Sequence, residues 1–177
     1  SRCAFGRIRS NEDVLWSFAP HDISMILGIT QSYPLSVNRI DSSFVQKGLS
    51  DISYLSLDFG DITANIHVSW MHPSKEQKLI VTSKNSILIF DDTLSWSEKV
   101  SKISYEFSSR NNESILNKSK QEFFPLPEDT EPLKLECQHF ISLINKEVNN
   151  ITDINEAINV IKVLEVSSKN RITNANK

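Results

Sequence analysis

The feature that most constrains the fold of this chain is a run of alternating segments between residues 34 and 107. In the segment Thr63–Met71, apolar and polar side chains alternate from Thr63 to Trp70, a period of two that is typical of half-buried β-strands. Comparable segments lie at 34–43, 52–59, 79–82, 86–90 and 96–107. Turns as short as Asp58–Asp61 separate them, which favours antiparallel pairing. The pattern predicts an open, mainly antiparallel sheet of about five to seven strands, a common sheet size.

Helical patterns flank this strand-rich region. Apolar residues recur at helical spacing near 20–30, 132–147 and 153–168. Pro20 and Pro132 suit the first turn of a helix, and Asp153 followed by Glu156 resembles a capping box. The last helix is expected to bury one apolar stripe, made of Ile154, Ala157, Ile158, Ile161 and Leu164. We therefore expect an α+β fold in which the helices pack on one face of the sheet.

The expected strands have apolar side chains on both faces, with Tyr54, Phe59 and Trp70 among them. A sheet of this kind needs a cover on the face that the helices leave open. We expect that cover to be another subunit, so that the protein is a homo-oligomer through its sheet face.

The length of 177 residues suits one domain with its own core, and we expect it to span 1–172. The segment 108–131 is polar and contains two prolines, which predicts a long loop. Residues 173–177 are expected to be a frayed tail. Since the chain opens with Ser1 rather than Met, we expect it to be a piece of a longer protein.

Composition argues against several classes of function. The net charge of −3 makes a nucleic-acid partner unexpected, and no apolar run reaches the roughly 18 residues of a membrane span. Cys3 and Cys137 are too few for a disulfide framework, so we expect a cytoplasmic protein, and no residues stand at zinc-ligand spacing. With four glycines and no Gly-x-Gly-x-x-Gly, the chain cannot bind a dinucleotide in that way by itself.

His21 is the main candidate for chemistry. It follows Pro20, at the point where an extended apolar segment is expected to become a helix. An imidazole at the positive end of a helix dipole is favoured in its neutral form, which can exchange a proton near pH 7. A histidine at such a place often only packs and caps, so this argument leaves both interpretations open.

Several segments, taken in order, resemble the C-terminal domain of the Gfo/Idh/MocA oxidoreductases. They are LWSFAPHDISMIL at 15–27, SWMHPSKEQKLIV at 69–81, PLKLECQHFISLI at 132–144 and VIKVLEVSS at 160–168. The resemblance extends from Ser1 to Ser168 and is greatest to the sugar-nucleotide branch. It implies oxidation of UDP-N-acetylglucosamine or its uronate at C3, on a path to surface-polysaccharide sugars.

The resemblance also implies roles for individual residues. His21 would lie beside the reacting sugar carbon, where either it or a lysine from an upstream Glu-Lys-Pro motif takes the hydroxyl proton. Many members have aspartates where this chain has Ser17 and Ser24, and the sugar-nucleotide branch has the same serines.

Five further residues are candidates for binding the substrate, namely Arg2, Arg7, Arg9, His72 and Lys75. A guanidinium fork matches the phosphates of a UDP-sugar or a C6 carboxylate. The alternatives are a solvated basic arm for the arginines, and structural hydrogen bonds and ion pairs around a tight turn for His72 and Lys75. Ala4 replaces an asparagine of the family, which removes one expected substrate contact.

The implied cofactor is NAD or NADP, bound mainly by a nucleotide-binding domain upstream of this chain. The chain alone is therefore expected to be inactive. Two other functions stay open: a non-catalytic assembly or substrate-binding module, and a family member that acts on another sugar or polyol such as inositol. A glycine-rich βαβ unit upstream would distinguish the enzyme from the assembly module.

Overall fold

The computed structural model describes residues 1–6, 8–110, 113–127 and 131–174. The chain divides into two compact units. Unit 1 consists of Ser1–Glu76 and Ile151–Lys177, and unit 2 consists of Gln77–Asn150. None of the described helices has both the length and the apolarity needed to cross a bilayer.

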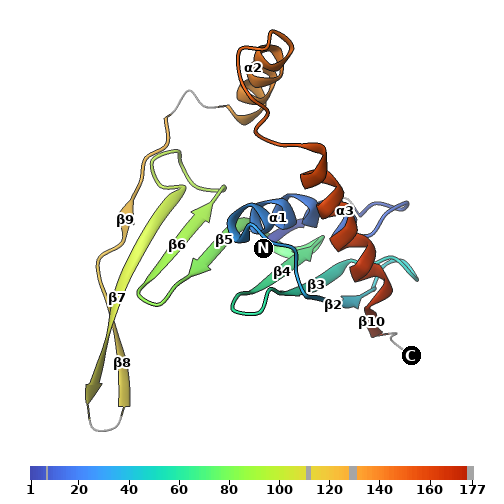
Figure 1. The fold of residues 1–177 in the computed structure, drawn as a ribbon. Helices are drawn as coiled ribbons and strands as arrows, with labels where there is room; N and C mark the ends of the chain where they lie inside the picture. The colour runs from blue at the N-terminus through green and yellow to red at the C-terminus, as the bar shows by residue number, and fades with distance from the viewer. Residues whose placement is uncertain (7, 111–112, 128–130, 175–177) are drawn as a thin grey trace. The chain divides into compact units, whose positions relative to one another are not determined.

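The sheet of unit 1 is built around an antiparallel meander (Figure 1). Its strands are β1 (Arg2–Phe5), β2 (Ser36–Ser42), β3 (Ile52–Asp58), β4 (Thr63–Ser69) and β10 (Arg171–Asn174), in the order β10-β2-β3-β4-β1. The meander β2-β3-β4 agrees with the sequence pattern. Strand β1 pairs with β4 and β10 pairs with β2, both in parallel, which the sequence did not predict. Residues 173 and 174, expected in a frayed tail, belong to β10.

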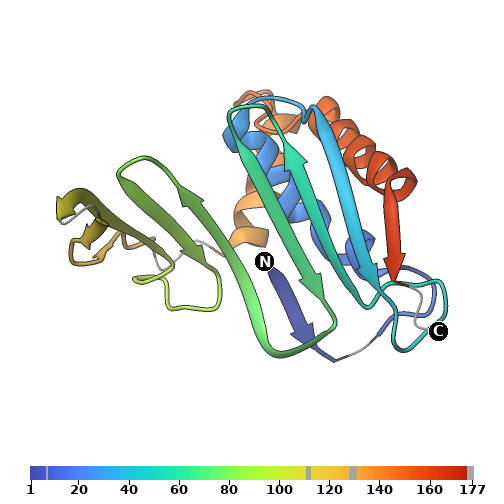
Figure 2. The ribbon, with the colours of Figure 1, turned by 90° about the horizontal axis from the view of Figure 1, so that it is seen from below.

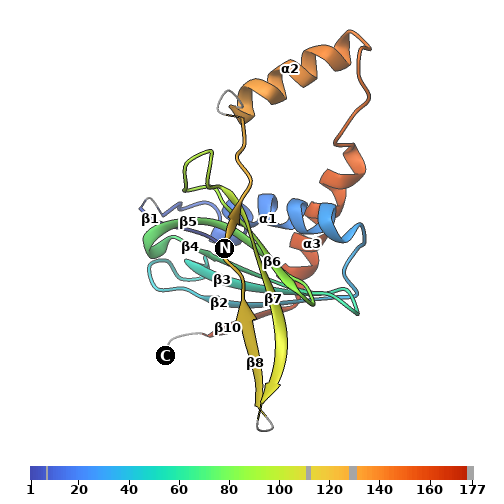
Figure 3. The same cartoon turned by 90° about the vertical axis from the view of Figure 1, so that its left-hand side faces the viewer.

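Two helices cover one face of this sheet, α1 (Val14–Thr30) and α3 (Ile154–Lys169) (Figures 2 and 3). The core between helices and sheet contains Val14, Leu15, Ala19 and Ile23 of α1, Val163 and Leu164 of α3, and Val37, Leu55, Leu57, Ile66 and Val68 of the strands. The strand residues alternate along β2, β3 and β4, so one face of each strand is buried. The α+β fold class with helices on one face of an open sheet is therefore confirmed for this unit.

The buried face of α3 differs from the expected one. Of the predicted stripe only Leu164 is buried, whereas Ile154, Ile158 and Ile161 are exposed. The helix turns Val160, Val163 and Ser167 toward the core instead. The sequence of α3 contains two neighbouring apolar stripes, and periodicity alone does not decide which one meets the sheet.

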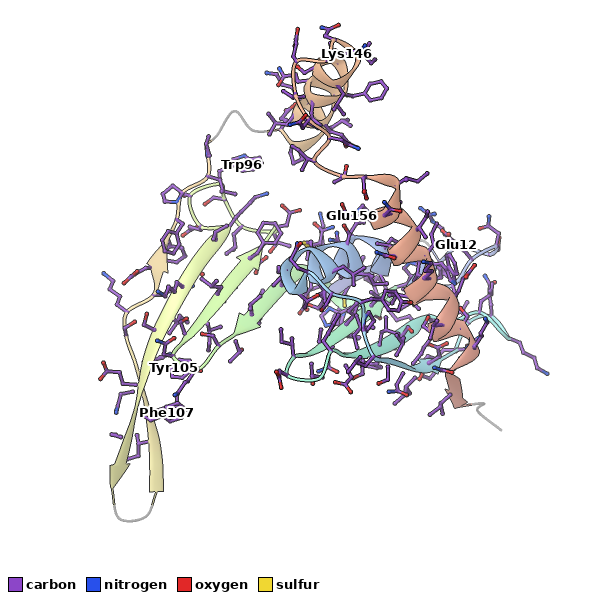
Figure 4. The ribbon with its side chains drawn as sticks, in the orientation of Figure 1. Glu12, Trp96, Tyr105, Phe107, Lys146 and Glu156 are labelled. Carbon is purple, nitrogen blue, oxygen red and sulfur yellow. The ribbon has the colours of Figure 1, made fainter. Side chains whose placement is uncertain are left out.

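Unit 2 is a smaller antiparallel arrangement. Its elements are the second part of β5 (Met71–Thr82), β6 (Ser86–Asp91), β7 (Val100–Arg110), β8 (Glu113–Lys118), β9 (Glu122–Phe123) and α2 (Pro132–Ile144). Strand β5 begins in unit 1 and ends in unit 2. Tyr105 and Phe107 on β7 make an edge-to-face contact at 5.7 Å and are drawn in Figure 4. Among the described residues of this unit, only Asp91 and Ser101 are buried.

The segment 108–131 is not the long loop that its polar composition suggested. It contains the end of β7 together with β8 and β9, and β8 pairs with β7 in an antiparallel hairpin. The described side chains of β8 are exposed, so polar residues occur on both of its faces and hide the period of two. Residues 111–112 and 128–130 lie outside the described part of the chain.

Candidate functional site

Helix α1 starts earlier than predicted, and this changes the setting of His21. Asp13 is the N-cap, and its side chain accepts a hydrogen bond of 3.1 Å from the backbone N–H of Trp16. Pro20 therefore lies inside the helix rather than in its first turn, and His21 follows it in the interior. The helix-dipole argument for a neutral His21 ring no longer applies, because that effect is confined to the first turn.

His21 is exposed and borders a hollow of about 570 Å³ between α1 and the start of α3. Its lining comprises Pro20, His21 and Ser24 of α1 together with Thr152, Asp153, Ile154, Glu156, Ala157, Val160 and Ile161. Within the described residues no hydrogen bond or ion pair engages the His21 ring. The ring is therefore available for proton exchange with a ligand in the hollow.

Ser24 and Glu156 join the two helices across this hollow. The Ser24 hydroxyl donates a hydrogen bond of 2.7 Å to Oε1 of Glu156, which lies near the N-terminal end of α3 (Figure 4). Ser24 stands one turn after His21 on α1. The sequence analysis placed Glu156 only in a helix cap and did not connect it with Ser24, because 132 residues separate the two and no local pattern links them.

The predicted substrate arginines that the structure describes are paired with carboxylates. Arg2 lies 3.4 Å from Oδ1 of Asp22, a residue of α1 that is 4% exposed, and Arg9 pairs with Glu12. Burial raises the pKa of Asp22 even though Arg2 opposes that shift. Arg7 lies outside the described residues. The structure therefore brings neither Arg2 nor Arg9 into the hollow beside His21.

His72 and Lys75 lie on β5, and neither lines the hollow. Nδ1 of His72 is 2.8 Å from the backbone carbonyl oxygen of Ser74, and Nε2 is 3.8 Å from Oε1 of Glu76. These are local contacts around a strand segment, the arrangement expected if His72 is structural.

A second hollow, of about 340 Å³, lies on the open face of the sheet of unit 1. The His67 ring stacks on Tyr54 at 4.5 Å, and the Cys3 thiol lies 3.6 Å from Nδ1 of His67. Burial raises the pKa of Cys3 to about 11, and burial lowers the pKa of His67. A protonated thiol is a poor nucleophile, so this pair is unsuited to covalent catalysis.

The cap network is a buried polar cluster that the sequence analysis missed. We use this name for Asp13, Arg39, Asp41, Ser50, Ser53 and Arg171. Arg39, 1% exposed, donates to Asp41 at 2.9 Å and to Asp13 at 2.6 Å. Ser50 and Ser53 donate to Asp41, and Arg171 forms an ion pair of 2.5 Å with it. The network ties the start of α1 to β2, β3 and β10.

Within the described residues, no group of three or more His, Cys, Asp and Glu side chains could hold a metal ion.

Comparison with known proteins shows the fold. No protein-family model and no curated protein matches the sequence. Among solved structures, UDP-N-acetylglucosamine 3-dehydrogenase GnnA from Acidithiobacillus ferrooxidans is similar with a TM-score of 0.71 at 17% identity, over 94% of this chain and 50% of that one. A protein from Desulfitobacterium hafniense, assigned as an NADPH-dependent oxidoreductase, is similar with a TM-score of 0.66 at 18% identity, over 90% of this chain and 46% of that one.

The yvaA protein from Bacillus subtilis, assigned to the oxidoreductases, is similar with a TM-score of 0.68 at 14% identity, over 95% of this chain and 52% of that one. The chain thus spans about half the length of the solved structures it matches. These neighbours are described as oxidoreductases, and the predicted α+β fold, with helices on one face of an open sheet, is shared with them.

Proposed function

We propose that this chain is the C-terminal part of a nicotinamide-dependent oxidoreductase of the Gfo/Idh/MocA family. Its substrate would be a UDP-N-acetylhexosamine or the corresponding uronate, oxidised at C3 in the synthesis of a surface-polysaccharide sugar. The observation that carries the proposal is His21, exposed on α1 and bordering a hollow, in a fold shared with a UDP-N-acetylglucosamine 3-dehydrogenase.

In the proposed reaction His21 takes the proton of the sugar hydroxyl as that carbon is oxidised. The nicotinamide, when bound, accepts the hydride. The chain has four glycines and no glycine-rich dinucleotide motif, so its own residues do not fit a dinucleotide cradle. The cofactor, NAD or NADP, would be held by a domain that precedes Ser1, and a lysine from that domain is the other candidate for the base.

Binding of the anionic part of the substrate falls to the basic residues, namely Arg2, Arg7, Arg9, His72 and Lys75. Arg2 and Arg9 can take this role only by exchanging Asp22 and Glu12 for a phosphate or carboxylate of the substrate. The pair of Arg9 and Glu12 is exposed and would exchange at little cost, since such pairs contribute only about 0–1 kcal/mol.

We further propose that a second copy of the chain covers the open face of the sheet, in a cytoplasmic oligomer. Ile40 and Tyr54 are exposed on this face. The same observation favours the second candidate function, a non-catalytic assembly module. Light scattering of the complete protein should give a mass above that of one chain, and a monomer would contradict this part of the proposal.

The test of the proposed reaction uses the complete gene product. Reduction of NAD and NADP is followed with UDP-N-acetylglucosamine, its uronate, inositol and glucose. We expect turnover with a UDP-hexosamine. Turnover with inositol or glucose alone would favour a different member of the family, and no turnover with any of the four would leave the assembly module.

A further inference from the structure

The α1–α3 hollow contains a selective set of polar groups. They are the His21 ring, the hydroxyls of Ser24 and Thr152, and the carboxylates of Asp153 and Glu156. Neither lysine nor arginine is among the residues that line it. Its volume of about 570 Å³ suits a small ligand, since such sites usually measure about 300–1,000 Å³. A hollow with carboxylates and no cation disfavours phosphate and suits a ligand that donates hydrogen bonds, such as a sugar with its hydroxyls.

Glu156 is held in a defined position at the edge of this hollow. Its side chain is half-buried, and Oε1 accepts the hydrogen bond from Ser24. Its backbone N–H donates to the Asp153 cap at 3.0 Å, which fixes the first turn of α3. A carboxylate has about four acceptor positions, so Glu156 retains capacity for a ligand hydroxyl after it has bound Ser24.

The lining of the hollow also has an apolar part. Ile154 and Ile161 of α3 line the hollow and are exposed, and Pro20, Ala157 and Val160 are the other apolar lining residues. A sugar ring presents hydroxyls at its edge and C–H groups on its faces, so its binding site needs both polar and apolar lining residues. Isoleucines exposed to solvent would gain from contact with such a face.

We propose that Glu156 is a substrate-binding residue, which accepts a hydrogen bond from a hydroxyl of a sugar ring lying beside His21. The inference rests on the proposed function and narrows it: this hollow holds the neutral sugar, and the diphosphate is bound elsewhere. Ser24 is a positioning residue, because it acts through Glu156 by fixing the carboxylate.

The competing explanation is that Ser24 and Glu156 only tie α1 to α3. Glu156→Gln separates the two, because glutamine keeps the size and still offers an oxygen to Ser24 but lacks the negative charge. A purely structural tie survives this change. Recognition of a sugar hydroxyl is weakened, because hydrogen bonds to charged groups are stronger than neutral ones. Glu165→Gln is the matched control, since it makes the same charge change on α3 at a residue that does not line the hollow.

The experiment measures the Kd of UDP-N-acetylglucosamine and of UDP by calorimetry, with the complete protein. UDP shares every group with the first probe except the sugar. We expect Glu156→Gln to raise the Kd of UDP-N-acetylglucosamine about tenfold while the Kd of UDP and the Tm stay unchanged. We expect Glu165→Gln to change none of these quantities.

The inference is overturned if Glu156→Gln binds UDP-N-acetylglucosamine like the control, or if its effect on UDP is equally large. Failure of the proposed reaction gives a different result. A protein that binds the sugar nucleotide through Glu156 but oxidises nothing would retain the binding site and lose the proposed activity. If the protein oxidises the sugar nucleotide and Glu156→Gln does not change its binding, the proposed reaction stands and the role of Glu156 is wrong.

Discussion

Helix α1 contributes residues to two polar clusters, one buried and one open to solvent. At its start, the Asp13 cap joins the cap network, where Arg39 and Asp41 are almost fully buried. Farther along, His21 and Ser24 border an open hollow, where no described partner engages the His21 ring. A buried charge must be paired or it destabilises the fold, whereas an exposed imidazole is free to react. The contrast predicts that mutations at the first cluster change stability and those at the second change activity.

The largest expected effect is at the hollow. In the complete protein, His21→Ala should lower kcat by roughly 10²–10⁴, the usual contribution of a general acid–base group. Urea denaturation should give an unchanged free energy of unfolding, because the ring is outside the core, and cofactor binding should persist. A nearly normal kcat on every UDP-hexosamine would assign His21 a structural role. His21→Asn keeps a polar side chain and should lose turnover as well.

The next effect concerns stability. Arg39→Ala leaves Asp13 and Asp41 without their main partner and should cost about 3–5 kcal/mol, as for other broken buried ion pairs. The control is Arg9→Ala, which breaks an exposed pair and should cost at most about 1 kcal/mol. Urea midpoints measure both. Equal losses for the two variants would show that the cap network does not differ from a surface ion pair.

Helix α3 offers the same contrast between its own two faces. Leu164→Ala removes a side chain that is 1% exposed, and should cost about 2–5 kcal/mol through the cavity it leaves. Ile154→Ala, at the edge of the hollow, should stay within about 0.5 kcal/mol because this side chain is 74% exposed. Thermal unfolding of the two variants compares the faces directly. A larger loss for Ile154→Ala than for Leu164→Ala would mean that Ile154 is buried, as the sequence analysis expected.

The mildest test is acidification. Burial alone would raise the pKa of Asp41, but hydrogen bonds from Arg39, Ser53 and Ser50 prevail and hold it below its ordinary value of 3.8. The ionised form is thus favoured in the folded state, so Asp41 stabilises the fold above its unfolded pKa. That contribution is lost as the pH falls through the folded pKa. We expect the urea concentration at the unfolding midpoint to decrease as the pH is lowered below about 4. The decrease should be less steep in Asp41→Asn.

The accuracy of the sequence analysis varied with how local each signal was. The meander of β2, β3 and β4 follows from period-two patterns and short turns, whereas the catalytic role of His21 stays a prediction. The start of α1 was misplaced because Pro20 suggested a first turn, whereas the tertiary partner Arg39 stabilises a cap at Asp13. The contact of Glu156 with Ser24 could not be predicted, since it joins two helices that are far apart in the sequence.

Unit 2 is an insertion within unit 1, because the chain leaves unit 1 at Glu76 and returns to it at Ile151. On the ribosome, β2, β3 and β4 therefore emerge before α3 and β10 have been made. Translation proceeds at about 5–20 residues per second, so several seconds pass between the synthesis of these strands and that of Val163 and Leu164, which cover their apolar side. During that interval Asp41 has Arg39 but lacks Arg171, its last partner to be synthesised. The nascent chain thus has an interval, open to chaperone binding or aggregation, that ends only when α3 and β10 have been made.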